Sequence, residues 1–306
     1  MASQKEEIVV GKYKVAVSNR KKIYWPDEGF TKGDVIDYYD KMSDHILPYL
    51  KDRPLSLKRN PNGILDEGFY HKDAGENAPS YVSVFKVKSE SSQKIIDYIV
   101  CNNKATLLYV ANLGCIEINP WNSTTKKPDQ PSWLVIDIDP SRKNTFTEVV
   151  DVALATKECF DKAGIRSYCK TSGSSGLHVY VPLKNKYDYT MVRDFAHLVA
   201  QLVHEQLPET TSLVRNLSKR GNKIYVDYLQ NRSGQTLASV YSIRPVKGAT
   251  VSTPVDWKEV NHRLHPSQFN IKNIFQRLKK KGDLFAPVLE EGISFPKALR
   301  LLEKVH

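Results

Sequence analysis

The stretch that decides the fold is SWLVIDIDPS, residues 132–141, an apolar run with two carboxylates near its end. Successive side chains of a β-strand point to opposite faces of the sheet. Asp137 and Asp139 therefore share one face, while the neighbouring residues Ile136 and Ile138 share the other. The spacing predicts a strand with a hydrophobic core on one side and an acidic patch on the other.

Downstream of this strand the apolar periodicity alternates between that of strands and that of helices. The predicted elements are a strand at 132–139, a helix opened by Thr145 with Glu148 and ended by Gly164, strands at 166–172 and 177–183, a helix that begins at Asp188, and a strand at 223–229. Their order, β-α-β-β-α-β, is the ferredoxin-like split βαβ motif. Right-handed crossovers then give the spatial strand order 4-1-3-2.

Two more polar side chains fall on the face of the acids. In LHVYVPL the apolar alternation leaves His178 on that face, and in KIYVDYL it leaves Asp227 there. Three carboxylates on adjacent strands repel one another unless cations neutralise them. Asp139 precedes a proline and could by itself be a turn residue, but a third acid inside an apolar strand favours bound metal.

The predicted acidic patch suits two divalent cations, Mn²⁺ or Mg²⁺, because hard cations prefer oxygen ligands. Two such ions can activate an attacking oxygen and stabilise a leaving phosphate. We therefore expect phosphoryl or nucleotidyl transfer, with Asp137, Asp139 and Asp227 as the catalytic and metal-binding residues.

A serine- and glycine-rich loop lies between two of the predicted strands, in KTSGSSGLHVY, residues 170–180. Ser172, Gly173 and Ser174 offer hydroxyls and unhindered backbone N–H groups that can cradle a triphosphate. Such a loop is alone more often a flexible turn, and a lone histidine is more often structural. The predicted position of His178 beside the acids favours contact with phosphate.

Basic and aromatic residues form a third layer typical of nucleic-acid contact. Arg220 and Arg244 flank the strand of the third acid, so we expect them to bind phosphates. The other candidates are Lys22 in NRKKIYWP, Lys32 in FTKGD, and the pair Phe69 and Tyr70 in GFYHK. Single surface cations are often merely solvated and aromatic pairs are often core, so these assignments depend on the other features.

The composition favours a cytoplasmic protein with a polyanionic partner. The 306 residues carry 45 Lys and Arg against 34 Asp and Glu, a net charge of +11, which is typical of nucleic-acid binding. The four cysteines lack the CxxC spacing of zinc sites and the density of a disulfide scaffold. No apolar run approaches the length needed to span a bilayer, so we expect no membrane attachment.

The chain is predicted to form one domain, residues 1–306, with three parts. A mixed α/β lobe at about 1–130 contains a helix capped by Thr31 and Asp34, and the segment 122–131 is predicted to be a loop or a lobe boundary. The catalytic lobe follows at about 131–250, and a helical segment at about 251–306 completes the chain.

Four motifs together resemble the polymerase domain of bacterial ligase D, of the archaeo-eukaryotic primase superfamily, which acts in non-homologous end joining. They are DID, SGSSGLHVYVPL, VDYLQN and YSIRP, and the resemblance runs from SNRKKIYWP to FPKALRLLEKV. It implies an α+β, two-lobed, primase-like fold with an N-terminal mixed α/β lobe and an RRM-like βαββαβ catalytic sheet.

The resemblance also implies an activity: a polymerase that extends 3′ ends and fills short gaps in DNA, often with ribonucleotides and Mn²⁺. Matched by motif, the roles are metal binding by Asp137, Asp139 and Asp227, contact with the incoming nucleotide by Ser172, His178, Arg220, Arg244 and Lys58, capture of a 5′-phosphate by Lys22 and Lys32, and packing on DNA by Phe69 and Tyr70. Implied partners are DNA ends, NTPs or dNTPs, the end-binding protein Ku, and ligase and phosphoesterase domains, in the bacterial nucleoid.

Two residues depart from the family pattern. Ser175 stands where some members carry a lysine, which concerns the grip on the triphosphate, and Asn119 stands where a histidine is expected, which concerns nucleotide contact and ribose preference. Other readings are a metal-dependent nuclease or nucleotidyl cyclase, and a non-catalytic RRM-like module that binds bases on an open sheet face. The sequence leaves open whether the chain stands alone or is part of a longer ligase D.

Overall fold

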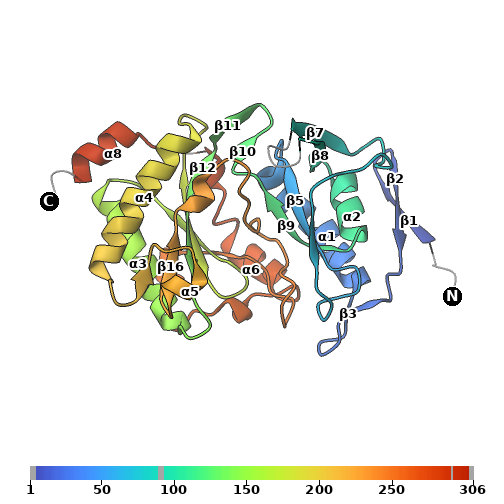
Figure 1. Ribbon diagram of the computed structural model, residues 1–306. Helices are drawn as coiled ribbons and strands as arrows, with labels where there is room; N and C mark the ends of the chain where they lie inside the picture. Colours follow the sequence, from blue (N-terminus) through green and yellow to red (C-terminus); the bar gives the residue numbers. More distant parts are fainter. Residues whose placement is uncertain (1–4, 89–92, 291, 303–306) are drawn as a thin grey trace.

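The computed structural model describes residues 5–88, 93–290 and 292–302 and has two lobes that lie side by side (Figure 1). The first half of the chain forms one lobe, and the second half forms most of the other. Both lobes mix helices and strands, which confirms the predicted α+β class. No helix in the described part is long and apolar enough to cross a membrane.

A six-stranded sheet forms the centre of the second lobe, in the order β15-β16-β12-β14-β13-β17. The strands are β12 (Trp133–Asp139), β13 (Tyr168–Thr171), β14 (Leu177–Pro182), β15 (Thr211–Ser212), β16 (Ile224–Asp227) and β17 (Pro254–Val255). The four middle strands, β16-β12-β14-β13, have the predicted order 4-1-3-2. The predicted topology is therefore confirmed, with two short edge strands added.

Two amphipathic helices, α3 (Phe146–Lys162) and α4 (Tyr189–Gln206), cover one face of this sheet. The capping box of Thr145 and Glu148 starts α3, and the Asp188 side chain caps α4, both as predicted. These caps satisfy backbone N–H groups that would otherwise lack partners at each helix start.

The central strand β12 contributes to two hydrophobic cores. Ile136 and Ile138 pack into the core beneath α3 and α4, whereas Trp133 and Val135 belong to the core that the sheet shares with the N-terminal lobe. Alternate side chains of β12 thus belong to two different hydrophobic cores, and neither face of the strand at these positions is turned to solvent.

The N-terminal lobe is built on a three-stranded sheet, β6-β5-β9, and two packed helices, α1 and α2. Its elements are β1 (Lys5–Val10), β2 (Tyr13–Ser18), β3 (Ile23–Trp25), β4 (Phe30–Thr31), α1 (Lys32–Leu50), β5 (Leu55–Arg59), β6 (Phe69–His71), β7 (Ser83–Lys88), β8 (Ile95–Val100), α2 (Lys104–Asn112) and β9 (Cys115–Pro120). The predicted capping box of Thr31 and Asp34 opens α1.

Two local predictions are wrong. The segment 122–131 is not a loop but contains a hairpin of two strands, β10 (Ser123–Thr124) and β11 (Lys127–Pro131). In the turn of this hairpin, the Thr125 N–H donates to the Asp52 carbonyl at 2.7 Å. The strand predicted to reach residue 229 ends at Asp227, because the Asp227 carboxylate accepts the Leu229 N–H at 2.7 Å and starts a 3₁₀ turn, η1 (Leu229–Asn231).

The last part of the chain joins both lobes together. Its elements are η2 (Trp257–Glu259), η3 (Pro266–Gln268), α6 (Ile274–Lys281), α7 (Pro287–Glu290) and α8 (Phe295–Leu302). A further short helix, α5 (Leu217–Arg220), lies earlier in the chain and precedes β16. α6 and α7 pack on the N-terminal core, whereas α8 packs on the core of α3 and α4. The predicted C-terminal helix includes residues 303–305, which lie outside the described residues.

Asn231 extends the hydrogen-bond ladder of β12 beyond the end of β16. Its fully buried side chain accepts the Val135 N–H at 2.9 Å and donates to the Val135 carbonyl at 2.7 Å. The amide thus replaces the backbone of a neighbouring strand. Without it, two buried backbone groups of the central strand would have no partner.

We predict that Asn231→Ala lowers the free energy of unfolding by about 2–4 kcal/mol, since each unsatisfied buried group costs roughly 1–3 kcal/mol. Urea denaturation followed by circular dichroism measures this loss. Asn222→Ala, at an exposed position, is the control and should change stability by less than about 0.5 kcal/mol. Equal stability of the two variants would contradict the structural role of Asn231.

Candidate active site

Strand pairing brings three of the predicted site residues together on one face of the sheet. Asp137 on β12 lies opposite Asp227 on β16 and, on its other side, opposite His178 on β14. Asp139 follows two residues later on the same face. This is the arrangement expected from the alternation of each strand.

The carboxylates are electrostatically strained by burial and by one another. The pKa of Asp137 is raised well above its usual range, first by burial and then by the negative charges of Asp227 and Asp139. Burial also raises the pKa of Asp227. The patch therefore has an unmet need for positive charge.

Each acid has a different polar neighbour. His178 Nε2 lies 3.3 Å from Asp137 Oδ1, and Arg220 Nη1 lies 3.4 Å from Asp139 Oδ2. The Gln230 amide donates to Asp227 Oδ2 at 3.0 Å. Arg220, predicted to bind nucleotide, is thus paired with an acid, with its side chain only 2% exposed.

The donor atoms suit a hard divalent cation, because three carboxylates supply oxygen ligands beside one another. Within the described ranges, however, no three acidic, histidine or cysteine side chains are already gathered around one point. The reason is that Arg220 engages Asp139, while Leu229 and Gln230 engage Asp227. Arg220 contacts Asp139 through Oδ2, and the Asp139 side chain is half exposed, so its other oxygen stays available to an ion.

A cavity of about 390 Å³ opens in front of the acids, between the two lobes. The catalytic sheet and its loop contribute Asp137, Asp139, Ser172, Ser174 and His178. The N-terminal lobe contributes Tyr70, Glu117 and Asn119, and the segment after β16 contributes Gln230 and Arg244. Most of the predicted nucleotide-binding residues therefore line one cavity.

The serine-glycine loop is held by its own first serine. Ser172 Oγ accepts the N–H groups of Ser174, at 3.1 Å, and Gly176, at 3.0 Å. These two N–H groups are not free, contrary to the predicted phosphate cradle. At Gly173, with φ +74°, a Cβ atom would lie 2.7 Å from Arg244 Cγ, so the loop requires glycine there.

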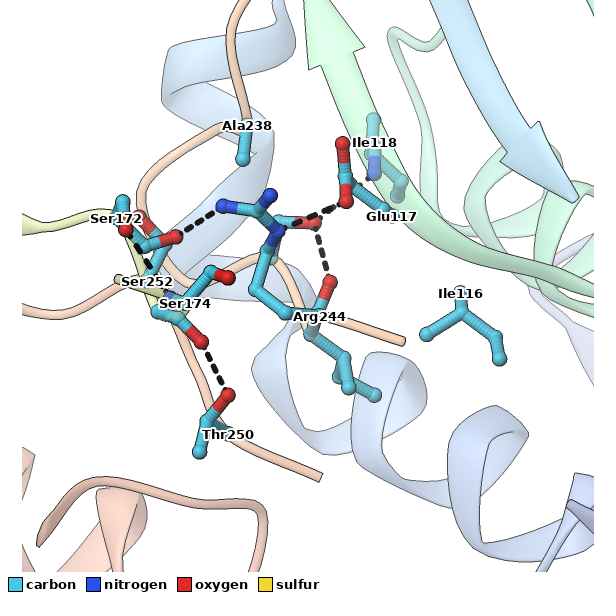
Figure 2. Close-up of polar contacts among 12 residues, drawn as sticks. Ile116, Glu117, Ile118, Ser172, Ser174, Ala238, Arg244, Thr250 and Ser252 are labelled. Atoms are coloured by element: carbon cyan, nitrogen blue, oxygen red, sulfur yellow. Dashed lines mark hydrogen bonds and ion pairs between the residues drawn. The ribbon is translucent and has the colours of Figure 1, made fainter. Parts of the chain in front are cut away.

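Arg244 connects this loop to the N-terminal lobe. Figure 2 shows its guanidinium between the two segments: Nε donates to Glu117 Oε2 at 2.8 Å, and Nη1 donates to the Ser172 carbonyl. The Thr250 hydroxyl donates to the Gly173 carbonyl on the same side. Glu117 was not predicted as a site residue, although an acid inside the buried strand CIEINP is a signal for a charged partner.

Lys58 does not line the cavity. Its ammonium donates to the Gly68 carbonyl at 2.7 Å and lies 5.1 Å from the centre of the Tyr70 ring. Phe69 and Tyr70 are 48% and 60% exposed. A cation covers one face of each ring, Lys58 for Tyr70 and Arg59 for Phe69, so only the other face of each ring can stack on a base.

A second cationic site lies in the N-terminal lobe around Lys32. The Lys32 residue is only 6% exposed, and burial, then the charges of Lys22 and Arg59, lower its pKa to about 8. Lys22 donates to Asn62 Oδ1, but the Lys32 ammonium has no hydrogen-bond acceptor among the residues described. A buried cation without a partner, near two others, favours an anionic ligand.

Three further residues near the acids were not among the predicted site residues, although Asn119 was noted as a departure from the family pattern. Asn119 is buried in the cavity wall, and its amide nitrogen has no hydrogen-bond partner in the described part of the chain. Gln230 orients Asp227. Lys170 lies behind His178, 2.9 Å from its Nδ1. A lysine inside the short strand YCKT was the available signal for the last of these.

Comparison with known proteins supports the resemblance seen in the sequence. Over 271 residues the chain is 34% identical to the bifunctional non-homologous end joining protein LigD of Bacillus subtilis, covering 88% of this chain and 43% of that protein. It is 29% identical to the multifunctional LigD of Mycolicibacterium smegmatis, covering 90% of this chain and 36% of the relative. The chain thus spans less than half the length of these relatives.

A solved structure agrees as well. The polymerase domain of Mycobacterium tuberculosis ligase D, in complex with DNA, superposes with a TM-score of 0.83 at 25% identity, covering 94% of this chain and all of that domain. The predicted primase-like fold is therefore confirmed. The model of the LigD primase-polymerase domain family matches residues 31–285. By fold and by sequence, this chain belongs to the LigD primase-polymerase domain family.

Proposed function

We propose that the chain is a DNA-repair nucleotidyltransferase that adds NTPs or dNTPs to primer 3′ ends, extends broken ends and fills short gaps, with a preference for ribonucleotides. The observation that carries the proposal is that Asp137 and Asp139 line an interlobe cavity while Asp227 pairs with Asp137 from the neighbouring strand. Relatives named as non-homologous end joining proteins support the cellular role.

Two divalent ions, Mn²⁺ or Mg²⁺, are the proposed cofactors, held by Asp137, Asp139 and Asp227. Such ions, when bound, activate the 3′-hydroxyl and stabilise the departing pyrophosphate. The chain itself supplies buried carboxylates whose mutual repulsion favours cations. Arg220, which lies beside Asp139, can compensate phosphate charge.

The incoming triphosphate is proposed to lie along the Ser172–Ser174 loop. His178 faces it with Nε2, and Arg244 lines the same cavity. In the described residues only Nε and Nη1 of Arg244 have acceptors, so Nη2 remains available for a phosphate oxygen. The unpaired amide of Asn119 is a further donor toward the nucleotide. Lys58 uses one of its three N–H donors on the Gly68 carbonyl, so two remain for a phosphate that reaches it from outside the cavity.

The DNA is proposed to cross the N-terminal lobe. Lys22 and Lys32 would hold the 5′-phosphate of a downstream strand, and Phe69 and Tyr70 would pack on exposed bases. Ku, together with ligase and phosphoesterase domains, completes the proposed set of partners in the bacterial nucleoid.

The reading as an RRM-like binding module finds no support in the fold, because the sheet has no open aromatic face. Tyr180 is 5% exposed and packs 5.8 Å from Trp133 and 5.1 Å from Phe285, between ring centres. A nuclease or a cyclase would use the same acids. Their products differ, since a polymerase lengthens a primer and releases pyrophosphate.

We predict metal-dependent extension of a labelled primer on a gapped duplex, and a loss of at least about 10³-fold in the Asp137→Ala/Asp139→Ala variant. The control is Asp129→Ala, an exposed acid of β11, which should retain activity. Failure of the folded wild-type protein to extend any primer, while it still binds the duplex in a salt-sensitive manner, would sink the polymerase assignment.

Relief of carboxylate repulsion gives a second prediction. In EDTA, Asp137→Asn should be more stable than wild type by about 1 kcal/mol or more, because one buried charge is removed. Mn²⁺ should raise the melting temperature of the wild type and have little effect on the variant. Thermal denaturation with and without Mn²⁺ tests both, and a wild type that Mn²⁺ leaves unchanged would argue against the metal site.

Removal of the buried ammonium tests the 5′-phosphate site. Lys32→Met should abolish any preference for a gap with a 5′-phosphate over one with a 5′-hydroxyl, a change of about tenfold or more for a charge-assisted contact. Extension rates on the two substrates measure the preference. Lys21→Met, at a neighbouring exposed position, is the control. An unchanged preference in Lys32→Met would place the phosphate elsewhere.

A further inference from the structure

Lys170 is a fully buried lysine directly behind the proposed active site. It lies on β13, opposite His178 on β14, and its side chain has no exposure to solvent. Its Nζ lies 2.9 Å from His178 Nδ1, 2.9 Å from the Ala238 carbonyl and 2.6 Å from Ser252 Oγ. Three contacts account for the three N–H donors of an ammonium group.

The partners of Lys170 determine the direction of these hydrogen bonds. A carbonyl oxygen such as that of Ala238 can only accept. The single proton of the Ser252 hydroxyl goes to the Thr171 carbonyl at 2.8 Å, so Ser252 Oγ must also accept from Lys170. The third N–H of Lys170 then points at His178 Nδ1, which accepts it.

We propose that Lys170 is a positioning residue that holds His178 as the tautomer with its proton on Nε2, the nitrogen that faces Asp137 and the cavity. A neutral imidazole carries one proton, and an Nδ1 that accepts leaves that proton on Nε2. His178 then offers a donor to an anionic oxygen: that of Asp137 in the free protein and that of a phosphate in the complex. This last role rests on the proposed function.

The opposite tautomer would create a conflict at Asp137. With the proton on Nδ1, Lys170 would have to act as a neutral amine and accept it, and the bare Nε2 lone pair would lie 3.3 Å from Asp137 Oδ1. With an ionised Asp137, two acceptors would then face each other in a buried site, which is unfavourable, and only a protonated Asp137 could donate to Nε2. Burial and then the charge of Arg244 lower the pKa of Lys170 to about 7, while the negative charge of Asp137 acts to raise it. The three acceptor contacts of Nζ, and not this pKa, identify Lys170 as the donor.

The direct test is the tautomer of His178 in the free protein, read from long-range ¹H–¹⁵N NMR spectra of protein labelled with ¹⁵N-histidine. The His178→Asn variant identifies the signals. We expect wild type to show the Nε2–H pattern. An Nδ1–H pattern in wild type would overturn the proposal, and this result needs no substituted Lys170, no nucleotide and no turnover, so it is independent of the polymerase assignment.

Two variants of similar length separate donation from packing. Lys170→Gln retains an N–H donor toward Nδ1 and should keep the Nε2–H pattern, whereas Lys170→Met cannot donate and should lose it. Cys169→Ala is the matched control, because Cys169 is buried on the same strand but belongs to the core of α3 and α4. It should keep the pattern despite some loss of stability.

Primer extension adds a functional readout. Lys170→Met should reduce kcat/KM for the nucleotide by about 10–100-fold, as the loss of a residue that orients a ligand typically does, and Lys170→Gln should restore much of it. Equal losses in both variants, with the tautomer of His178 unchanged, would make Lys170 merely structural and would overturn the proposal.

Discussion

The position of Asp137 between two neighbouring strands is the constraint on which the site depends. Because β12 pairs with β14 on one side and with β16 on the other, Asp137 faces His178 and Asp227 at the same level of the sheet. The strand register holds the backbones of these residues side by side, so their side chains project from the same level of the same face. The rest of the site must therefore compensate for carboxylates that are buried together.

That compensation comes from segments that are far apart in the sequence. An imidazole from β14, a guanidinium from α5 and an amide from η1 each approach a different acid. Behind them, Lys170 and Arg244 add positive charge that lowers the pKa of His178, after burial itself. The free protein thus offsets only part of the negative charge with its own cations, at a cost in stability that proteins often accept at functional sites.

The sequence allowed the sheet and its acidic face to be predicted because both depend on a period of two residues. LVIDID and LHVYVPL each show which side chains share a face, and the β-α-β-β-α-β order then determines the neighbours. Contacts that join distant segments left no such pattern. Glu117 and Arg244 are separated by 127 positions, and the use of Ser172 to bind its own loop depends on tertiary folding. The hairpin within 122–131 was missed because its polar residues resemble those of a loop.

The hydrophobic core that the two lobes share also limits how the protein can move. Trp133 and Val135 of β12 belong to the core that the two lobes share, so a hinge rotation of one lobe against the other would have to disrupt close packing on that face of the strand. Domain closure around substrate is therefore disfavoured. The cavity is preformed, and adaptation to different DNA ends must come from side chains at its rim, with a small conformational cost of binding.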